Sequence, residues 1–118
     1  MKTIIALLAF ILPFSNSAQA LTGNDLNEMS DTNKLGAARY VQGLMDYMTF
    51  EYAKDKFVAE LEKKEFPYSQ YICVPRGSNY GQAFEIVIND IKAKPESRHE
   101  NASELAFYAL LEVWHCTK

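Results

Sequence analysis

The residues of this chain that could carry out chemistry are few: two cysteines, Cys73 and Cys116, and two histidines, His99 and His115. A thiolate beside an imidazole can act as a nucleophile, and thiolates with imidazoles can bind zinc. None of these residues has the C-x-x-C or H-x-x-x-H spacing that is typical of a zinc site. The two histidines fall at opposite ends of one expected helix, about 24 Å apart along its axis. We therefore expect no metal site and no cofactor.

Motifs for catalysis are missing from the sequence as well. It contains no Gly-rich phosphate-binding loop, no G-x-S-x-G and no H-E-x-x-H. A bond between Cys73 and Cys116 would also remove the only candidate thiolate. We predict that the chain is not an enzyme and has no catalytic residues. A small exported enzyme is the alternative, and it would require Cys73 as a free thiol.

The first 20 residues have the pattern of a secretory signal peptide. Lys2 precedes an apolar run from Ile4 to Leu12, Pro13 ends this run, and Ala18-Gln19-Ala20 supplies the small-x-small cleavage pattern. The alternative is a membrane anchor, but a span needs about 20 apolar residues, and polar residues interrupt this stretch. We expect cleavage after Ala20 and a periplasmic domain over residues 21–118.

Export also favours a disulfide between the two cysteines. An even number of cysteines in an exported protein is typical of disulfide pairing. The bond between Cys73 and Cys116 would close a loop of about 44 residues, which stabilises a fold by roughly 4 kcal/mol in the chain-entropy model. Two free thiols, or a metal site with His99 and His115, are the alternatives.

The charge of the expected mature chain limits its partners. The sequence has 12 basic and 15 acidic residues, and one of the basic residues, Lys2, lies in the signal peptide. Neither sign forms a long block, so the composition does not favour nucleic acid or an anionic membrane surface as a partner. The size of the mature chain fits one domain.

Helix signals predict an all-α, compact single domain of four to five helices with one disulfide. Thr22 or Asn24 can cap a short first helix that ends near Ser30. Asn33 can cap a second helix from Lys34 that is about five turns long. Its apolar residues recur at three- and four-residue steps: Leu35, Ala38, Val41, Met45, Met48 and Tyr52.

Two further features of this second helix concern its packing and its end. Gly36 and Gly43 each weaken a helix by about 1 kcal/mol relative to alanine, which favours a close approach of another helix. Phe57, Val58 and Leu61 continue the apolar pattern towards Lys63 and Lys64, where the helix could bend or restart.

The segment from Phe66 to Gly77 interrupts the helical pattern with two prolines and is expected to be a largely irregular surface loop. Such loops on a rigid scaffold commonly carry recognition. Ser78 is expected to cap a central helix from Asn79 to about Ala93, because apolar residues cover more than one face of this stretch.

Pro95 and Glu96 are expected to open a last helix that ends near Trp114. A polar cluster of Glu96, Arg98 and His99 lies at its expected start. We interpret this cluster as structural, with Glu96 near the exposed amides of the first turn and Arg98 reaching an acid on a neighbouring helix. A binding patch is the alternative. One face of the helix is apolar: Ala102, Leu105, Ala106, Ala109 and Val113.

Several spaced residues together resemble a known family. The stretch Cys73-Val74-Pro75-x-Gly77-x-x-x-Gly81-Gln82 is followed by Val87, by Pro95-Glu96-x-Arg98-His99-x-x-Ala102, by Leu105 and Ala109-Leu110, and by Cys116. Upstream lie Thr22-Gly23-Asn24-x-Leu26 and Tyr40-Val41-x-Gly43-Leu44-x-Asp46. This pattern resembles the Tai family of type VI secretion amidase immunity proteins. Many members carry a second cysteine pair, which this chain lacks, so it is similar to members with a single disulfide, including those paired with the fourth amidase group.

The resemblance implies a periplasmic, helical, homodimeric protein that binds a peptidoglycan amidase and occludes its active-site groove. A proline-stiffened loop with tyrosines suits this role, because it loses little entropy on docking. We expect the loop from Pro67 to Tyr80 to contribute to the effector-binding surface through six residues: Pro67, Tyr68, Tyr71, Arg76, Asn79 and Tyr80. The connection from Lys92 to Glu96 is the alternative element.

A second class of function is also open to a small exported helical protein with one disulfide. An acid-stress chaperone of the periplasm binds unfolded clients rather than one folded enzyme. Such a protein would lose its dimer or expose apolar surface near pH 2 to 3, whereas an immunity protein would bind one amidase at neutral pH.

Overall fold

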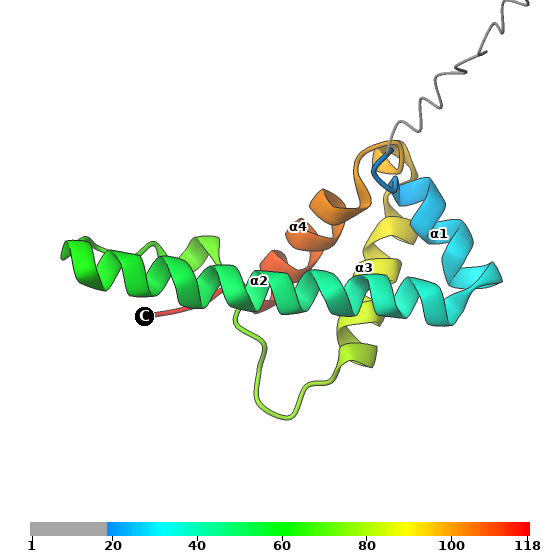
Figure 1. Ribbon diagram of the computed structural model, residues 1–118. Coiled ribbons are helices and arrows are strands. Elements are labelled where there is room, and N and C mark those ends of the chain that lie inside the picture. Colours follow the sequence, from blue (N-terminus) through cyan, green and yellow to red (C-terminus); the bar gives the residue numbers. More distant parts are fainter. Residues whose placement is uncertain (1–18) are drawn as a thin grey trace, which may run out of the picture.

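The computed structural model describes residues 19–118, and this part of the chain contains helices and their connections without a β-sheet (Figure 1). The predicted signal peptide falls almost entirely outside the described residues. The described α-helices are α1 (Gly23–Thr32), α2 (Lys34–Glu62), α3 (Tyr80–Ala93) and α4 (Ala102–Trp114), with short 3-10 helices η1 (Tyr68–Gln70) and η2 (Pro95–Ser97). This arrangement confirms the predicted all-α domain with one disulfide.

Helix α1 begins at a capping box. The Thr22 hydroxyl oxygen accepts a hydrogen bond from the Asp25 amide at 3.2 Å, and the Asp25 carboxylate accepts one from the Thr22 amide at 2.8 Å. At the other end, the Asn33 amide donates to Met29 O at 2.8 Å, and Asn33 Oδ1 accepts from the Gly36 amide at 3.0 Å. Asn33 therefore ends α1 and caps α2 at once, and the two helices join with a sharp turn.

Helix α2 is longer than the sequence pattern predicted. It is unbroken over its 29 residues, so the predicted length of about five turns is wrong. It ends only at Lys63, which adopts the left-handed conformation with φ of 53°. The N-terminal half of α2 packs in the core, whereas its C-terminal half projects beyond the other helices (Figure 1). We call this projecting half, residues 49–62, the α2 arm.

The core face of α2 is carried by Ala37, Val41 and Met45, which are buried. Leu35 was expected on the same face but is 69% exposed. The reason is helical geometry: two residues correspond to about 200° of rotation, so Leu35 lies on the opposite side from Ala37.

Helix α3, which was predicted to be central, packs against α1, α2 and α4. Its N-cap is Asn79 and not the predicted Ser78. Asn79 Oδ1 accepts from the Gln82 amide at 2.9 Å, and Gln82 Oε1 accepts from the Asn79 amide at 3.0 Å. Asn79 has a glutamine three residues later to complete this capping box, whereas Ser78 has Gly81 there. The helix buries five apolar side chains: Ala83, Phe84, Val87, Ile88 and Ile91.

The predicted start of the last helix at Pro95 is wrong. Pro95 opens η2, and α4 begins only at Ala102. The intervening backbone pairs instead with the first residues of α1: the Gly23 and Asn24 amides donate to Glu100 O and Arg98 O at 2.9 and 2.8 Å. The Ala102 amide donates to Leu21 O at 2.7 Å. These hydrogen bonds take the place of the helical hydrogen bonds expected for residues 95–101. They tie the start of α1 to the start of α4.

The close helix approach occurs at a glycine other than the expected ones. A Cβ atom at Gly43 would meet nothing within 4 Å, and one at Gly36 would meet the side chain of its own N-cap, Asn33. At Gly23, in contrast, a Cβ atom would lie 2.5 Å from Leu105 Cδ1 and 3.0 Å from the Arg98 backbone. Gly23 thus allows α1 to contact α4 and the connection before it.

Helix α4 completes the core, and its apolar face differs at one position from the prediction. Leu110 is fully buried, whereas Val113 is 52% exposed. Leu26 of α1 and Ile72 of the α2–α3 connection also belong to this core. Within residues 19–118, no helix combines the length and the apolar composition needed to cross a membrane.

Candidate functional site

The connection between α2 and α3 is not a simple surface loop, because its first part is packed. Phe66 and Ile72, which were expected to lie at the surface, are buried. Phe66 stacks on Tyr71 with ring centroids 4.7 Å apart, and it makes edge contacts with Tyr52 of α2 and Tyr68. This aromatic cluster covers one side of the α2 arm and fixes where the connection begins.

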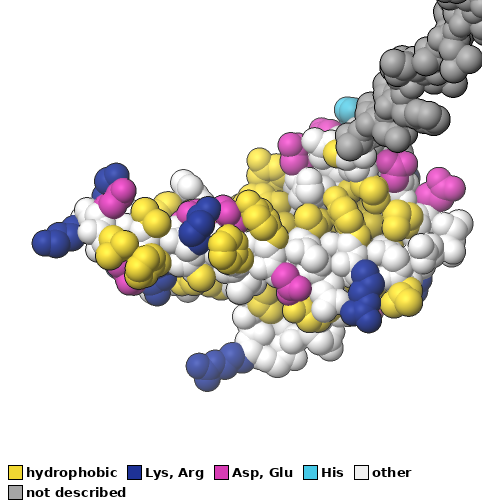
Figure 2. All heavy atoms as spheres, in the orientation of Figure 1, with side chains coloured by type: hydrophobic (Ala, Val, Ile, Leu, Met, Phe, Trp, Pro, Cys, Tyr) yellow, Lys and Arg dark blue, Asp and Glu magenta, His cyan; other side chains and the backbone are white. Residues whose placement is uncertain are grey.

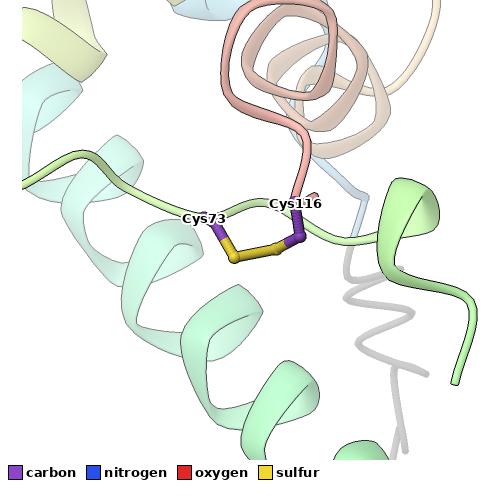
Figure 3. Close-up of a disulfide and its surroundings, with 2 residues drawn as sticks. All are labelled: Cys73 and Cys116. Atoms are coloured by element: carbon purple, nitrogen blue, oxygen red, sulfur yellow. A yellow bond between two sulfur atoms is a disulfide. The ribbon is translucent and has the colours of Figure 1, made fainter. Parts of the chain in front are cut away.

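A disulfide, shown in Figure 3, and backbone hydrogen bonds fix the middle of the connection. Cys73 and Cys116 are bonded to each other, which confirms the predicted pairing and makes the free-thiol and metal-site alternatives wrong. The Cys73 amide donates to Trp114 O at 2.7 Å, and the Cys116 amide donates to Tyr71 O at 2.8 Å. Cys116 is buried and Cys73 is exposed, so the bond joins the core to the surface.

Tyr71 is tied to α2 through its hydroxyl. It donates a hydrogen bond to Asp55 Oδ2 at 2.8 Å. This bond holds the pKa of the Asp55 carboxyl below its usual value and raises the pKa of the Tyr71 hydroxyl. Tyr71 therefore has a structural partner in the chain and is not a free contact residue.

Tyr80 and Asn79 have structural partners as well. The Tyr80 hydroxyl donates to Asp46 Oδ1 at 2.7 Å, and this bond raises the pKa of the tyrosine. The polar side chain of Asn79 caps α3, as described above. Tyr80 remains 45% exposed, so its ring is still accessible at the surface.

Residues 72–79, between the two tethered tyrosines, form what we call the tethered loop. It projects from the helices on one side of α2 (Figure 1). At its tip the Ser78 amide donates to Pro75 O at 3.1 Å, and Gly77 has φ of 84°. A positive φ at the third of these four residues is the geometry of a type II turn, which favours glycine. Arg76 precedes Gly77 in this turn and is exposed.

The six predicted effector-binding residues therefore lie in three places. Pro67 and Tyr68 lie beside the aromatic cluster at the α2 arm, together with Tyr71. Asn79 and Tyr80 line a shallow depression of about 280 Å³ near Asp46. Arg76 stands apart at the tip, where its side chain makes no hydrogen bond or ion pair with another described residue.

The predicted polar cluster of Glu96, Arg98 and His99 has a different arrangement from the one expected. Arg98 reaches no acid; its Nε donates to Ile91 O at 2.8 Å and its guanidinium Nη2 to Lys92 O at 2.7 Å. These carbonyls lie at the C-terminal end of α3, where partial negative charge attracts a cation. Glu96 lies in η2, away from the first turn of α4, and both Glu96 and His99 are exposed. The described residues hold no group of three or more possible metal ligands.

One exposed feature was not predicted as a binding surface. Five large apolar side chains of α2, from Tyr47 onward, are between 42% and 67% exposed and form what we call the α2 stripe: Tyr47, Phe50, Phe57, Val58 and Leu61. At 100° per residue they fall within about 100° of one another and away from the core face. The sequence alone could have indicated this surface, because helical spacing places these five residues on the side of α2 away from the core residues Val41 and Met45.

Comparisons with known proteins identify the family. A search of curated proteins and a search of solved structures found no match to this chain. The sequence profile of the Rap1a immunity proteins matches residues 17–116. This range includes the tethered loop, both cysteines and all four described helices. The chain therefore belongs to the Rap1a immunity proteins, a family of effector immunity proteins.

Proposed function

We propose that this protein is a periplasmic immunity protein that binds a type VI secreted peptidoglycan amidase and occludes its active-site groove. The family membership supports an effector as the partner. The resemblance to the Tai proteins supports an amidase, and the single disulfide is similar to the members paired with the fourth amidase group. The main observation in favour of the occlusion mechanism is the tethered loop. At its tip, Arg76 makes no hydrogen bond or ion pair with another described residue.

The loop suits occlusion because it is held before the partner arrives. The disulfide, two tyrosine–aspartate hydrogen bonds and the turn at Gly77 restrict the eight residues of the tethered loop. A restricted element loses less conformational entropy on docking than a flexible one, so more of the contact energy appears as affinity. Arg76 is the residue of this loop that we expect to contact the amidase most directly.

The alternative element, the connection from Lys92 to Glu96, is less free to make new contacts. Lys94 Nζ lies 2.6 Å from Asp90 Oδ1, and Lys92 Nζ lies 3.5 Å from Asp31 Oδ1. The backbone carbonyl oxygen of Lys92 already accepts a hydrogen bond from the Arg98 guanidinium. These contacts favour the tethered loop over this connection.

A periplasmic location is supported by the predicted signal peptide and by the disulfide, which is stable in an oxidising compartment. The expected cut after Ala20 is compatible with the fold, because Gln19 and Ala20 are exposed and Leu21 O already accepts a backbone hydrogen bond from Ala102. Sequencing the N-terminus of the exported protein tests this cut; a start at Leu21 supports it.

We further propose that the protein is a homodimer paired through the α2 stripe. The stripe is symmetric about Lys54: Tyr47 and Phe50 precede it by seven and four residues, and Val58 and Leu61 follow it by four and seven. An antiparallel pair centred on Lys54 would set Tyr47 opposite Leu61 of the partner subunit. Figure 2 shows hydrophobic side chains between the charged ones along the α2 arm. Each exposed aromatic ring can bury about 150 Å² or more, so both copies together could approach the area of a stable interface.

The exposed α2 stripe also favours the second candidate function, a chaperone of the acid-stress type, since apolar surface can bind unfolded clients. One pair of assays separates the two. An immunity protein inhibits the amidase encoded beside its gene at neutral pH and does not suppress aggregation of unrelated proteins. A chaperone suppresses that aggregation at low pH and leaves the amidase active. The second result would contradict our proposal.

A further inference from the structure

A groove of about 530 Å³ lies between the middle of α2, residues 70–72 and α4. It is separate from the tip of the tethered loop. Leu44, Met48 and Phe107 are half-buried in its lining and Ile72 is buried, which gives the groove an apolar floor. Tyr47 and Tyr108, in contrast, are 60% and 64% exposed. Tyrosine is enriched at protein–protein interfaces.

The charged residues that line this groove are all acidic: Glu51, Asp55 and Glu104. Lys54, which is close by, compensates for part of this charge, because its Nζ lies 2.8 Å from Glu51 Oε1 and 3.4 Å from Asp55 Oδ1. Glu104 forms no ion pair with another described residue. The groove therefore keeps a net negative charge, and Glu51 raises the pKa of the Tyr47 hydroxyl.

The walls of the groove are held in place by contacts described above. Tyr71 is hydrogen-bonded to Asp55 across the groove's edge, and Ile72 pairs with His115 in an isolated antiparallel bridge. The groove is therefore formed before a partner binds, and little reorganisation is required of it.

We propose that this acidic groove binds a segment of the effector in which an apolar side chain is flanked by lysine or arginine. The apolar floor accepts the side chain, and the carboxylate of Glu104 pairs with the cation, while the remaining acids of the groove add to the negative charge around it. This contact is additional to that of the tethered loop, and it rests on the proposed function, because the partner is the same amidase.

Charge also argues against a second copy of this chain as the occupant. The chain is acidic overall, with a formal charge of −3, so a second copy would meet like charge at the groove. In the α2 stripe, Phe50, Phe57 and Leu61 do not line the groove. The stripe and the groove are thus largely separate surfaces that share Tyr47.

Matched substitutions test the groove in the full mature chain, with the amidase encoded beside its gene as the probe. We expect Glu104→Lys and Tyr108→Ala each to weaken amidase binding about tenfold or more, measured by titration calorimetry. The controls are Glu85→Lys on α3 and Val113→Ala on α4, which are exposed and do not line the groove. They should change the dissociation constant by less than about twofold.

A photocrosslinking amino acid at position 108 identifies the occupant directly. The expected crosslink is to an amidase peptide with a lysine or arginine within a few residues of the attached side chain. A crosslink to a second copy of the chain, or binding by Glu104→Lys as tight as by the unmodified chain, would overturn the groove proposal alone. No binding of the amidase to the unmodified chain would overturn the groove proposal and the proposed function together.

Discussion

The hydroxyl of Tyr80 lies 2.7 Å from Asp46 Oδ1, a hydrogen bond between residues 34 positions apart in the chain. Tyr71 and Asp55 form the matching bond at 2.8 Å. Both aspartates belong to α2, so one helix holds both ends of the tethered loop. The two tyrosines thus act as positioning residues for the element that we expect to enter the amidase.

Removing one of these bonds should loosen the loop without unfolding the domain. In Tyr80→Phe the ring remains but the bond to Asp46 is lost, so the amides of residues 74 and 76–79 should exchange with deuterium faster. Hydrogen-exchange mass spectrometry measures this. Tyr68→Phe is the control, because the Tyr68 hydroxyl has no hydrogen-bond partner among the described residues. Equal exchange in Tyr80→Phe and the unmodified chain would show that the bond does not restrain the loop.

The stability of the domain should fall in acid because of two aspartates. Hydrogen bonds from Thr22 lower the pKa of Asp25, and the bond from Tyr71 lowers that of Asp55, from an ordinary value of 3.8. The stability that these carboxylates contribute is complete above pH 3.8 and is lost as the pH falls through their lower folded values. Urea denaturation at several pH values should show this loss.

Substitution identifies the source of that acid dependence. Asp55→Asn removes one of the two groups, so its urea midpoint should change less between about pH 4 and pH 2 than that of the unmodified chain. Glu60→Gln is the control, since the Glu60 side chain has no hydrogen bond or ion pair with another described residue. An acid dependence in Asp55→Asn as steep as in the unmodified chain would contradict the assignment.

Much of the fold follows from local signals in the sequence. Thr22 and Asn33 are caps that side-chain chemistry reveals, and the spacing of Val41 and Met45 predicts a buried helix face. The full length of α2 was missed because the repeat of apolar residues that begins at Leu35 stops at Tyr52, and the apolar residues beyond it lie on another face of the helix. A helix continues through such a change when no residue breaks it, and here none does before Lys63.

The candidate site was predicted only in part, because its partners are distant in sequence. The prolines and tyrosines between Phe66 and Gly77 indicated a recognition loop. The predicted export of the chain indicated that its two cysteines form a disulfide. Nothing local shows that Tyr71 binds Asp55 or that Tyr80 binds Asp46, 16 and 34 residues away. These tyrosines were therefore expected to face the effector, whereas their hydroxyls are used inside the chain. Arg98 was misassigned similarly, since its carbonyl partners have no side-chain signature.

Two glycines should respond in opposite directions to alanine. Gly43→Ala should raise the free energy of unfolding by about 1 kcal/mol, because the new methyl group meets nothing and alanine favours a helix. Gly23→Ala should lower it by about 1–3 kcal/mol, because the methyl group collides with Leu105 and the Arg98 backbone. Chemical denaturation measures both. A stabilising Gly23→Ala would mean that α1 and α4 approach less closely than described.

The α2 stripe should control self-association. Phe57→Glu and Leu61→Glu place charge on an exposed apolar face, so they should give a monomer with an unchanged circular dichroism spectrum. Light scattering with size-exclusion chromatography measures the mass. Leu35→Glu, an equally exposed apolar residue at the other end of α2, is the control and should leave the dimer intact. A dimer that survives both arm substitutions pairs through another surface.

Inhibition of the neighbouring amidase is the most direct measurement of the central claim. Mature chain, added in increasing amounts to the purified amidase with peptidoglycan as substrate, should abolish hydrolysis near a one-to-one ratio. Arg76→Glu, alone and with Tyr68→Ala, should require about tenfold more protein for the same inhibition, whereas Lys94→Glu in the α3–α4 connection should not. Full inhibition by the Arg76→Glu, Tyr68→Ala variant would contradict the loop assignment, and an amidase that the unmodified chain leaves active would contradict the proposed function.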